Sequence, residues 1–179
     1  MELFPFKFLL DPLIGEITED LGGTTGTLGI QEIRTPLNIE ESKYKIAPIV
    51  CYESIYGEFL GEFIQNGANV IFILTNDGWW GNSPGYKQHL AYARLRAIET
   101  RRYIARCANT GESAYIDDKG NILQKTQYWK KDMIESTIPL LTKQTFYVRN
   151  GDYLGRLGLF VGILLFLYTI TKSIKNKQE

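Results

Sequence analysis

The chain has 179 residues, and its 20 acidic side chains balance 20 basic ones, so the formal net charge is zero. This balance argues against a nucleic-acid partner, because domains that bind nucleic acid carry an excess of lysine and arginine. The length fits one domain. Two cysteines and a single histidine exclude a disulfide framework and the common zinc clusters, and no phosphate-binding glycine motif indicates a cofactor.

The N-terminal region precedes the first predicted strand. Residues 2–13 are mainly apolar but are interrupted by Glu2 and Lys7, so they lack the long apolar core of a signal peptide. Residues 15–29 are rich in glycine and threonine, a composition that predicts a loop.

The first predicted strand covers residues 44–50 and ends at Cys51, and a helix is predicted over residues 57–66. A thiol at the end of a buried strand, followed by Tyr52 and Glu53, is typical of a nucleophile in an α/β enzyme. The thiolate is the reactive form, so a neighbouring base or cation would activate it. The alternative is an inert cysteine, because free cysteines are among the most buried residues. Glu53 either orients the site or forms a surface salt bridge.

A second strand is predicted over residues 69–75, whose near-continuous apolar run fits a sheet covered on both faces. It leads into the loop NDGWWG at residues 76–81. Trp79 and Trp80 in this loop either line a binding groove or pack in the core.

The longest predicted helix covers residues 85–103, with Leu90, Ala93, Ala97 and Ile104 on one face. His89 near its start is either a catalytic base or a structural residue. A hairpin is predicted over residues 113–116 and 122–125, and one more strand over residues 133–139.

The C-terminal segment 157–171 carries no charge and is apolar on all faces, unlike a surface helix. It is shorter than the ~20 residues that span a bilayer, but Arg156 and Lys172 can extend its reach. We expect a partial enzyme domain at residues 1–153, then a transmembrane helix and a basic cytoplasmic tail at residues 154–179. The alternative is a buried core helix.

Four motifs together carry a family resemblance: Cys51-Tyr52-Glu53, the loop at residues 76–81, the helix with QHLAYARLRAIE at residues 88–99, and RCANTG at residues 106–111. In this order and spacing they resemble the C-terminal half of the nitrilase, or carbon–nitrogen hydrolase, superfamily. More narrowly, they resemble the apolipoprotein N-acyltransferases, bacterial membrane enzymes that add the third acyl chain to lipoproteins.

The resemblance implies an α/β fold, the C-terminal part of an αββα sandwich followed by a transmembrane helix. It implies a protein of the bacterial inner membrane whose catalytic domain is extracytoplasmic. The implied partners are a phospholipid acyl donor and a diacylated lipoprotein acceptor, and the implied intermediate is a thioester on a cysteine. The glycine-rich region at residues 15–29 would be a lid over the acyl pocket.

The resemblance also assigns roles to residues. Cys51 is the expected nucleophile, the backbone N–H of Tyr52 an oxyanion donor, and Glu53 a catalytically important carboxylate. Glu2 resembles the glutamate of a Glu-x-x-Pro stretch of the family. Because the family base is a glutamate, His89 is expected to be structural. The expected catalytic and substrate-binding residues are Cys51, Tyr52, Glu53 and Glu2, and Trp79, Trp80 and Asn76.

One departure from the family pattern affects the expected activity. The family uses a glutamate base and a lysine that precede the Glu-x-x-Pro stretch, and no residue of this chain can be assigned to either role. We therefore expect a C-terminal fragment, from an internal start, a split gene or a frameshift, that is inactive without an upstream half. An apolar sheet face would then be exposed, and Cys107 is expected to pack. The alternatives are an amidase of the same superfamily and a non-catalytic membrane-anchored remnant.

Overall fold

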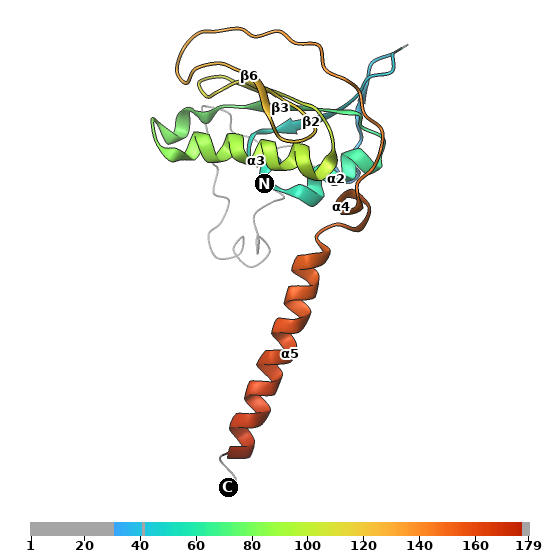
Figure 1. Cartoon of the computed structure of the whole chain (residues 1–179), viewed down its shortest axis with the longest axis vertical. Helices are drawn as coiled ribbons and strands as arrows, with labels where there is room; N and C mark the ends of the chain where they lie inside the picture. The colour runs from blue at the N-terminus through green and yellow to red at the C-terminus, as the bar shows by residue number, and fades with distance from the viewer. Residues whose placement is uncertain (1–30, 41, 177–179) are drawn as a thin grey trace. The chain divides into compact units, whose positions relative to one another are not determined.

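The computed structural model describes residues 31–40 and 42–176 (Figure 1). The chain divides into two units, Met1–Arg34 and Thr35–Glu179. Every helix and strand reported below belongs to the second unit. Glu2 and the predicted lid at residues 15–29 lie outside the described residues.

A six-stranded mixed sheet forms the centre of the second unit, with the strands side by side in chain order. The three central strands β2, β3 and β4 are parallel, whereas β1, β5 and β6 pair antiparallel with their neighbours. The strands are β1 (Leu37–Asn38), β2 (Lys45–Val50), β3 (Val70–Thr75), β4 (Ile104–Ala108), β5 (Ala114–Ile116) and β6 (Ile122–Lys125).

The helices connect the parallel strands and then lead to the C-terminus. Two short 3₁₀ turns follow β2 and β3 at the carboxyl edge of the parallel strands, and α2 and α3 make the two crossovers (Figure 1). The helical elements are η1 (Cys51–Ile55), α2 (Gly57–Gln65), η2 (Asp77–Trp80), α3 (Pro84–Thr100), α4 (Phe146–Asn150) and α5 (Tyr153–Asn176).

One face of the sheet is buried under α2 and α3. Strand positions that alternate in sequence point to this face, such as Ile49 opposite Ile73 and Ile71 opposite Ile104. Leu60 of α2 and Ala93 of α3 join the same apolar cluster. At roughly 25 cal/mol per Å², burial of such side chains is the main stabilising term of the fold.

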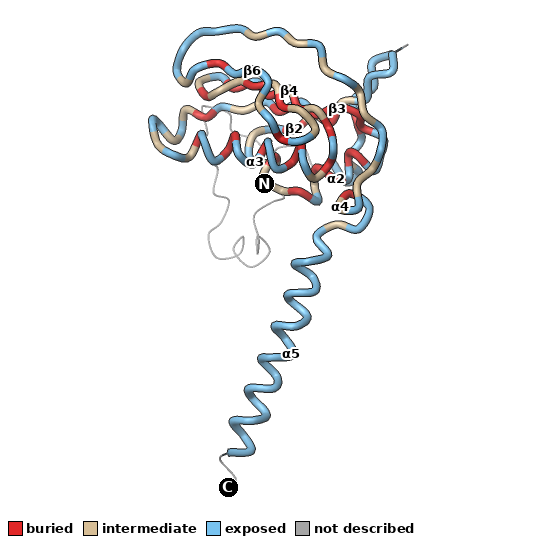
Figure 2. The backbone as a smooth tube through the Cα atoms, viewed as in Figure 1, coloured by how far each residue is buried: buried red, intermediate tan, exposed pale blue. Residues whose placement is uncertain are grey.

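The opposite face of the sheet is open in the described structure, and Figure 2 shows the alternation of buried and exposed positions along the strands. Val50 lies opposite Leu74, which lies opposite Cys107. Val50 is 59% and Leu74 52% exposed. In the described part of the chain, the strand expected at residues 69–75 is covered on one face only, and the expected exposed apolar face is present. Cys107 is exposed and does not pack as expected.

Most predicted elements are confirmed within one or two residues at most of their ends, including the hairpin and the α/β class. Two of the predicted elements are wrong at their ends or absent. The long helix ends at Thr100, where Arg101 takes a left-handed conformation with φ 50°, and Ile104 begins a strand. Arg106 lies in the middle of β4 and interrupts the apolar pattern by which this strand could be predicted from the sequence. Residues 133–139 form no strand; alternate residues are half-buried, so the sequence pattern there reflects one-sided contact rather than strand pairing.

The long segment between β6 and α4 has no regular secondary structure but is fixed to the domain by Arg102. This side chain is 1% exposed and donates to the carbonyl oxygens of Ala68 at 3.0 Å and Lys143 at 2.8 Å. It also donates to the carbonyls of Thr100 and Arg101. Burial lowers the pKa of Arg102 to about 10, so the guanidinium remains charged at neutral pH.

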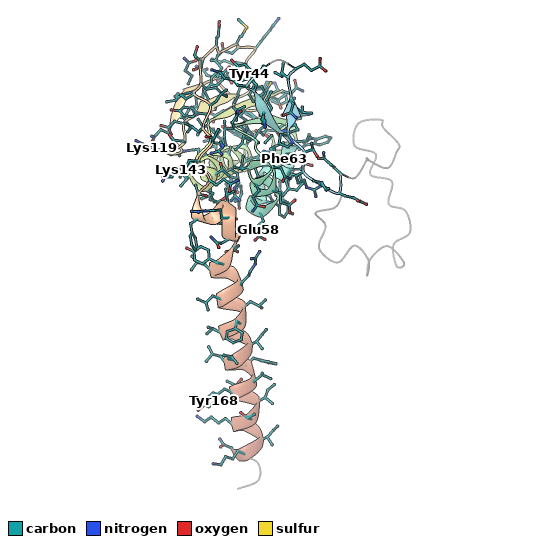
Figure 3. All side chains as sticks on the ribbon, turned by 90° about the vertical axis from the view of Figure 1, so that its right-hand side faces the viewer. Tyr44, Glu58, Phe63, Lys119, Lys143 and Tyr168 are labelled. Carbon is teal, nitrogen blue, oxygen red and sulfur yellow. The ribbon has the colours of Figure 1, made fainter. Side chains whose placement is uncertain are left out.

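The C-terminal helix α5 has 24 residues, which corresponds to about 36 Å at 1.5 Å per residue. Its side chains project on all sides, Tyr168 among them (Figure 3), and none of its residues is buried. With a mean hydropathy of 1.9 in its most apolar window, it is long and apolar enough to cross a membrane. The alternative of a buried core helix is therefore wrong.

Candidate active site

Cys51 occupies a sharp turn between β2 and η1. Its φ is 50°, a left-handed conformation that costs a non-glycine residue roughly 1–3 kcal/mol. Two hydrogen bonds hold the turn: Glu53 accepts from the Val50 N–H at 2.7 Å, and the Ser54 hydroxyl donates to the Cys51 carbonyl at 2.8 Å. The fold therefore maintains an unfavourable backbone conformation at the residue that the sequence identifies as a nucleophile.

The thiol of Cys51 meets the end of the neighbouring strand. Because β2 and β3 are parallel, their carboxyl ends lie at the same edge, and Thr75 Oγ1 approaches Cys51 Sγ to 3.3 Å. The same hydroxyl lies 3.0 Å from Asp77 Oδ1. Since a hydroxyl has one proton, Thr75 donates either to the sulfur or to the carboxylate. Thr75 thus connects the thiol to a buried charged group.

That group is Asp77, which is fully buried at the start of η2. Arg106 Nη2 lies 2.5 Å from one carboxylate oxygen, and His89 Nδ1 lies 2.9 Å from the other. Burial by itself would raise the pKa of Asp77, but the hydrogen bonds and charges of His89 and Arg106 outweigh it and lower this pKa. Asp77 is therefore an anion at neutral pH, and it joins the end of β3, the middle of β4 and helix α3.

His89 lies beneath the turn, 2% exposed. Its Nε2 is 2.9 Å from the Ser54 hydroxyl and 3.2 Å from the Cys51 carbonyl, while Nδ1 faces Asp77. Both ring nitrogens thus contact groups that support the backbone of Cys51, and neither has a hydrogen bond to its sulfur. The geometry fits a structural histidine, as the sequence analysis expects.

The two expected site residues next to Cys51, Tyr52 and Glu53, lie in different surroundings. The Glu53 carboxylate accepts a hydrogen bond from the Val50 N–H and thereby stabilises the turn. The Tyr52 side chain is 53% exposed, and its backbone N–H is in the first turn of η1, where amides lack intrahelical partners. These positions suit a supporting carboxylate and a backbone donor beside the thiol.

The three residues expected to bind substrate lie in different surroundings. Asn76 accepts from the Gly78 N–H at 3.1 Å and the Thr110 hydroxyl at 3.0 Å, so its side-chain oxygen fixes the loop. Trp79 is 65% exposed. Trp80 is half-buried, with its ring centroid 5.3 Å from that of His89. A small pocket of about 60 Å³ beside the turn is lined by Tyr52, Ile55, Trp80, Gly85, Gln88, His89 and Tyr92.

Sequence reasoning did not assign roles to Ser54, Thr75, Asp77 and Arg106. Two signals were present: Asp77 is in the loop motif at residues 76–81, and Arg106 is a charge on an otherwise apolar strand. In the described part of the chain, no group of three histidine, cysteine or acidic side chains could hold a metal ion.

Comparison with known proteins agrees with this geometry. Residues 2–146 match the sequence profile of the family described as Carbon-nitrogen hydrolase. An Apolipoprotein N-acyltransferase of Chlorobaculum tepidum is 38% identical over 129 residues, which cover 72% of this chain and 24% of the relative. An Apolipoprotein N-acyltransferase of Shewanella oneidensis is 35% identical over 151 residues, 84% of this chain and 28% of the relative. The chain thus spans about a quarter of the length of these curated relatives.

Solved structures share the fold. A carbon–nitrogen hydrolase from Helicobacter pylori superposes with a TM-score of 0.53 at 16% identity, over 60% of this chain and 44% of that chain. An amidase from a Nesterenkonia species, solved with acrylamide added at its active-site cysteine, gives a TM-score of 0.51 at 15% identity, over 75% of this chain and 52% of that chain.

Proposed function

This chain belongs to the carbon–nitrogen hydrolase family, and on that premise we propose that it carries the nucleophile part of an acyl-transfer site. The observation that supports the proposal most is the strained turn that presents Cys51 at the carboxyl edge of the parallel strands. Similarity to the Apolipoprotein N-acyltransferases narrows the proposal to transfer of a fatty acyl chain from a phospholipid to the N-terminal amine of a lipoprotein.

The proposed reaction has two steps. The Cys51 sulfur attacks the ester carbonyl of the phospholipid; a C–S bond forms, the C–O bond breaks, and the lysophospholipid alcohol leaves with the proton of the thiol. The lipoprotein amine then attacks the thioester; a C–N bond forms, the C–S bond breaks, and a proton of the amine returns to the sulfur. Each step passes through an oxyanion, which the backbone N–H of Tyr52 would stabilise.

The neighbours of Cys51 have supporting roles in this proposal. Thr75 donates to the sulfur as the thiolate forms, and Glu53 maintains the turn. Trp79, Trp80 and Asn76 contribute the loop against which the acyl chain is bound. Glu2 remains a proposed site residue outside the described part of the chain.

The base comes from outside the described residues in this proposal. Among those residues, Thr75 provides the one side chain hydrogen-bonded to the Cys51 sulfur, and no carboxylate or amine does so. A thiol with an ordinary pKa near ~8.5 is only a few per cent thiolate at neutral pH. No residue of this chain is assigned to the family lysine either, and loss of one oxyanion donor alone costs roughly 10²–10³ in rate. We therefore propose that turnover needs a base and an oxyanion donor from outside the described residues.

The proposed topology places residues 1–153 outside the cytoplasm of a bacterial inner membrane and residues 154–179 in the membrane and its cytoplasmic side. The exposed apolar helix α5 supports this placement, with Lys172 and Lys175 near its end. Extraction of membranes with alkaline carbonate is expected to leave the chain in the pellet. Its release into the supernatant would contradict a spanning helix.

Formation of the acyl-enzyme tests the chemistry. The chain is co-expressed with the part of the Chlorobaculum tepidum relative that precedes the matched region, then supplied with a phospholipid carrying an alkyne-tagged acyl chain. We expect a label that neutral hydroxylamine releases. Cys107→Ser is the matched control: it should keep the label, while Cys51→Ser should lose it. The assignment is wrong if the label persists in Cys51→Ser and disappears in Cys107→Ser.

Turnover of the 179 residues by themselves tests whether they contain the base. The purified chain in detergent is assayed for acyl transfer to a diacylated lipopeptide, and for hydrolysis of a simple amide as the alternative activity. We expect neither reaction. Robust turnover that Cys51→Ala abolishes would show that the 179 residues contain their own base.

A further inference from the structure

Three buried side chains behind Cys51 form a continuous hydrogen-bonded chain. Asp77 Oδ1 lies 2.9 Å from His89 Nδ1, and His89 Nε2 lies 2.9 Å from the Ser54 hydroxyl. All three side chains are buried. The proposed acyl transfer assigns no step to any of them.

The order and the distances of these groups resemble those of a catalytic triad, in which a serine attacks the substrate. Ser54 is not placed for that role. Its side chain is fully buried, and its hydroxyl donates to the Cys51 carbonyl oxygen at 2.8 Å. The chain therefore acts on the protein backbone rather than on a substrate.

The backbone group at the end of the chain is the Cys51 carbonyl. Ser54 Oγ lies 2.8 Å and His89 Nε2 lies 3.2 Å from its oxygen. This carbonyl and the N–H of Tyr52, the proposed oxyanion donor, belong to one peptide unit. In a planar trans peptide the C=O and the N–H point in opposite directions. Holding the oxygen on the buried side therefore directs the Tyr52 N–H to the opposite side of the turn.

Protons can be assigned along the chain from its two ends. Asp77 is an anion, so it accepts from His89 Nδ1. The Cys51 carbonyl can only accept, so Ser54 donates to it and thereby uses its one proton. Ser54 then accepts from His89 Nε2. In this arrangement His89 donates from both ring nitrogens, and Asp77 compensates the charge of the ring while Arg106 binds its other oxygen.

Aromatic rings fix the imidazole of His89 in this orientation. The Trp80 ring meets it nearly perpendicularly, at 74° with centroids 5.3 Å apart, and the Tyr52 ring lies 6.0 Å away. Trp80 is itself fixed by Gly85, where a Cβ atom would lie 2.7 Å from the indole. The imidazole is therefore held against Ser54 and the Cys51 carbonyl.

These contacts have two consequences for the peptide between Cys51 and Tyr52. They keep it in place although the left-handed conformation of Cys51, with φ 50°, is unfavourable. They also polarise it, because hydrogen bonds that are linked in a low-dielectric interior strengthen one another. A donor at the carbonyl oxygen thus makes the N–H of the same peptide a stronger donor.

We propose that Asp77, His89 and Ser54 are positioning residues for the oxyanion donor: together they hold and polarise the peptide whose N–H belongs to Tyr52. The inference rests on the proposed role of Cys51 as the nucleophile of an acyl transfer. Its effect is on reactions in which a substrate oxygen becomes negative, beyond any effect on the thiol itself.

Two reactions of the same thiol separate this role from a structural one. The full chain is purified in detergent with Cys107→Ser, which leaves Cys51 as the one thiol of the sequence. p-Nitrophenyl acetate acylates the sulfur through a tetrahedral oxyanion; a C–S bond forms, the ester C–O bond breaks, and p-nitrophenolate leaves. Iodoacetamide alkylates the sulfur with loss of iodide and without an oxyanion. Both reactions need the thiolate, so at one pH the ratio of their rates reports oxyanion stabilisation. Cys51→Ala gives the background rate.

We expect Ser54→Ala to lower the ratio of acylation to alkylation roughly tenfold, less than the ~10²–10³ lost when an oxyanion donor is itself removed. His89→Gln keeps an N–H donor in place of the imidazole and should retain more of this ratio than His89→Leu. The His89 pair decides the question independently if Ser54→Ala does not fold. Variants that slow both reactions equally, and so leave the ratio unchanged, would overturn the proposal.

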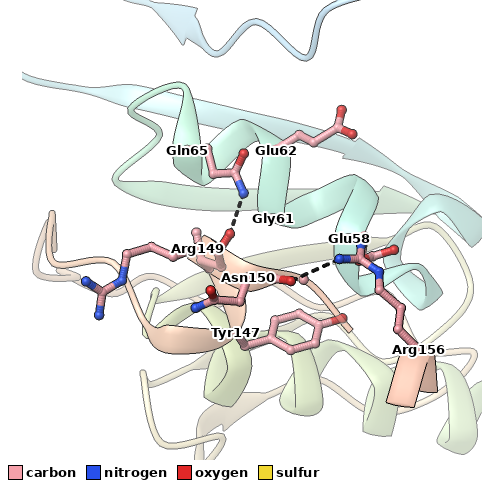
Figure 4. Close-up of a pocket in the computed structure, with 10 residues that line it drawn as sticks. Glu58, Gly61, Glu62, Gln65, Tyr147, Arg149, Asn150 and Arg156 are labelled. Atoms are coloured by element: carbon pink, nitrogen blue, oxygen red, sulfur yellow. Dashed lines mark hydrogen bonds and ion pairs between the residues drawn. The ribbon is translucent and has the colours of Figure 1, made fainter. Parts of the chain in front are cut away.

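Two control variants remove donors to backbone carbonyls in other places. Thr100→Val removes a fully buried hydroxyl that donates to the Arg96 carbonyl at 2.7 Å. Gln65→Met removes a side chain that donates to the Val148 carbonyl, in the pocket between α2, α4 and α5 (Figure 4). Both should keep the wild-type ratio, and a tenfold loss in either would contradict a specific role of Ser54.

The activated ester also separates this inference from the proposed function. p-Nitrophenyl acetate reacts with a thiolate without a phospholipid site and without an enzymatic base. A chain in which Ser54→Ala lowers the ratio, but which forms no thioester from a phospholipid with its upstream half, would contradict the proposed acyl transfer and support the positioning role.

Discussion

Two ion pairs in this domain have the same length and opposite surroundings. Arg106 and Asp77 meet at 2.5 Å with both side chains 0% exposed. Arg156 and Glu58 also meet at 2.5 Å, but their side chains are 66% and 48% exposed. The first pair supports the turn that presents Cys51, and the second lies at the junction with α5.

The difference between these pairs shows that burial, rather than distance, determines what an ion pair contributes. Removing one partner of a buried pair leaves an uncompensated charge and costs about 3–5 kcal/mol. An exposed pair is screened by water and contributes about 0–1 kcal/mol. The rigid part of the molecule should therefore be the site around Cys51, and the adaptable part the junction with α5.

The largest effect is expected for Arg106→Gln. The change leaves Asp77 buried as an anion without its arginine partner, so we expect a loss of about 3–5 kcal/mol in the free energy of unfolding. Urea denaturation in detergent measures this loss. A loss below about 1 kcal/mol would mean that the buried network does not support the fold.

A smaller loss is expected for His89→Leu. The leucine removes one hydrogen-bond partner from Asp77 Oδ1 and one from the Ser54 hydroxyl, at a cost of about 1–3 kcal/mol. The same change should alter the rate at which iodoacetamide modifies Cys51, because His89 supports its carbonyl. Unchanged stability together with unchanged labelling would show that His89 merely fills space.

Acid should weaken the buried network around Asp77. The pKa of Asp77 is lowered in the folded state, so its contribution to stability is present above its unfolded pKa of about 3.9 and is lost as the pH falls through the folded value. We expect the melting temperature to fall below about pH 4 in the wild type and to vary less with pH in Asp77→Asn. Parallel pH profiles would contradict this assignment.

The smallest effect is expected at the junction. Arg156→Gln breaks the exposed pair with Glu58 and should change the free energy of unfolding by less than about 1 kcal/mol, an effect that salt reduces further. Denaturation at low and high salt measures it. A loss as large as that of Arg106→Gln would show that the two regions do not differ as their exposure indicates.

Much of the fold could be predicted from sequence, because the apolar periods of β2, β3, α2 and the β5–β6 hairpin are clear. The miss at β4 has a physical cause. Arg106 is tolerated inside a buried strand because Asp77 neutralises it, and that partner is 29 residues away in sequence. Periodicity reports local patterns and cannot detect such a compensating charge.

The candidate site was predicted as single residues rather than as a network. Cys51 and the loop at residues 76–81 were identified from their motifs, but the contact between Cys51 and Thr75 depends on the parallel pairing of β2 and β3. Ser54 was not identified, since a serine in a turn carries no signal of its own. The roles of Cys51, Glu53 and Glu2 stay predictions.

Arg102 ties the segment before α4 to parts of the domain that are distant in sequence. Its guanidinium joins Ala68, Thr100 and Lys143, so we expect the segment before α4 to attach after β3 and α3 have packed. Contacts between residues so distant in sequence form late, because closing long loops costs entropy. The irregular segment 126–145 should consequently be the last part to acquire protection from hydrogen exchange. Cleavage of this segment by a protease should therefore destabilise the domain, although the segment contains no helix or strand.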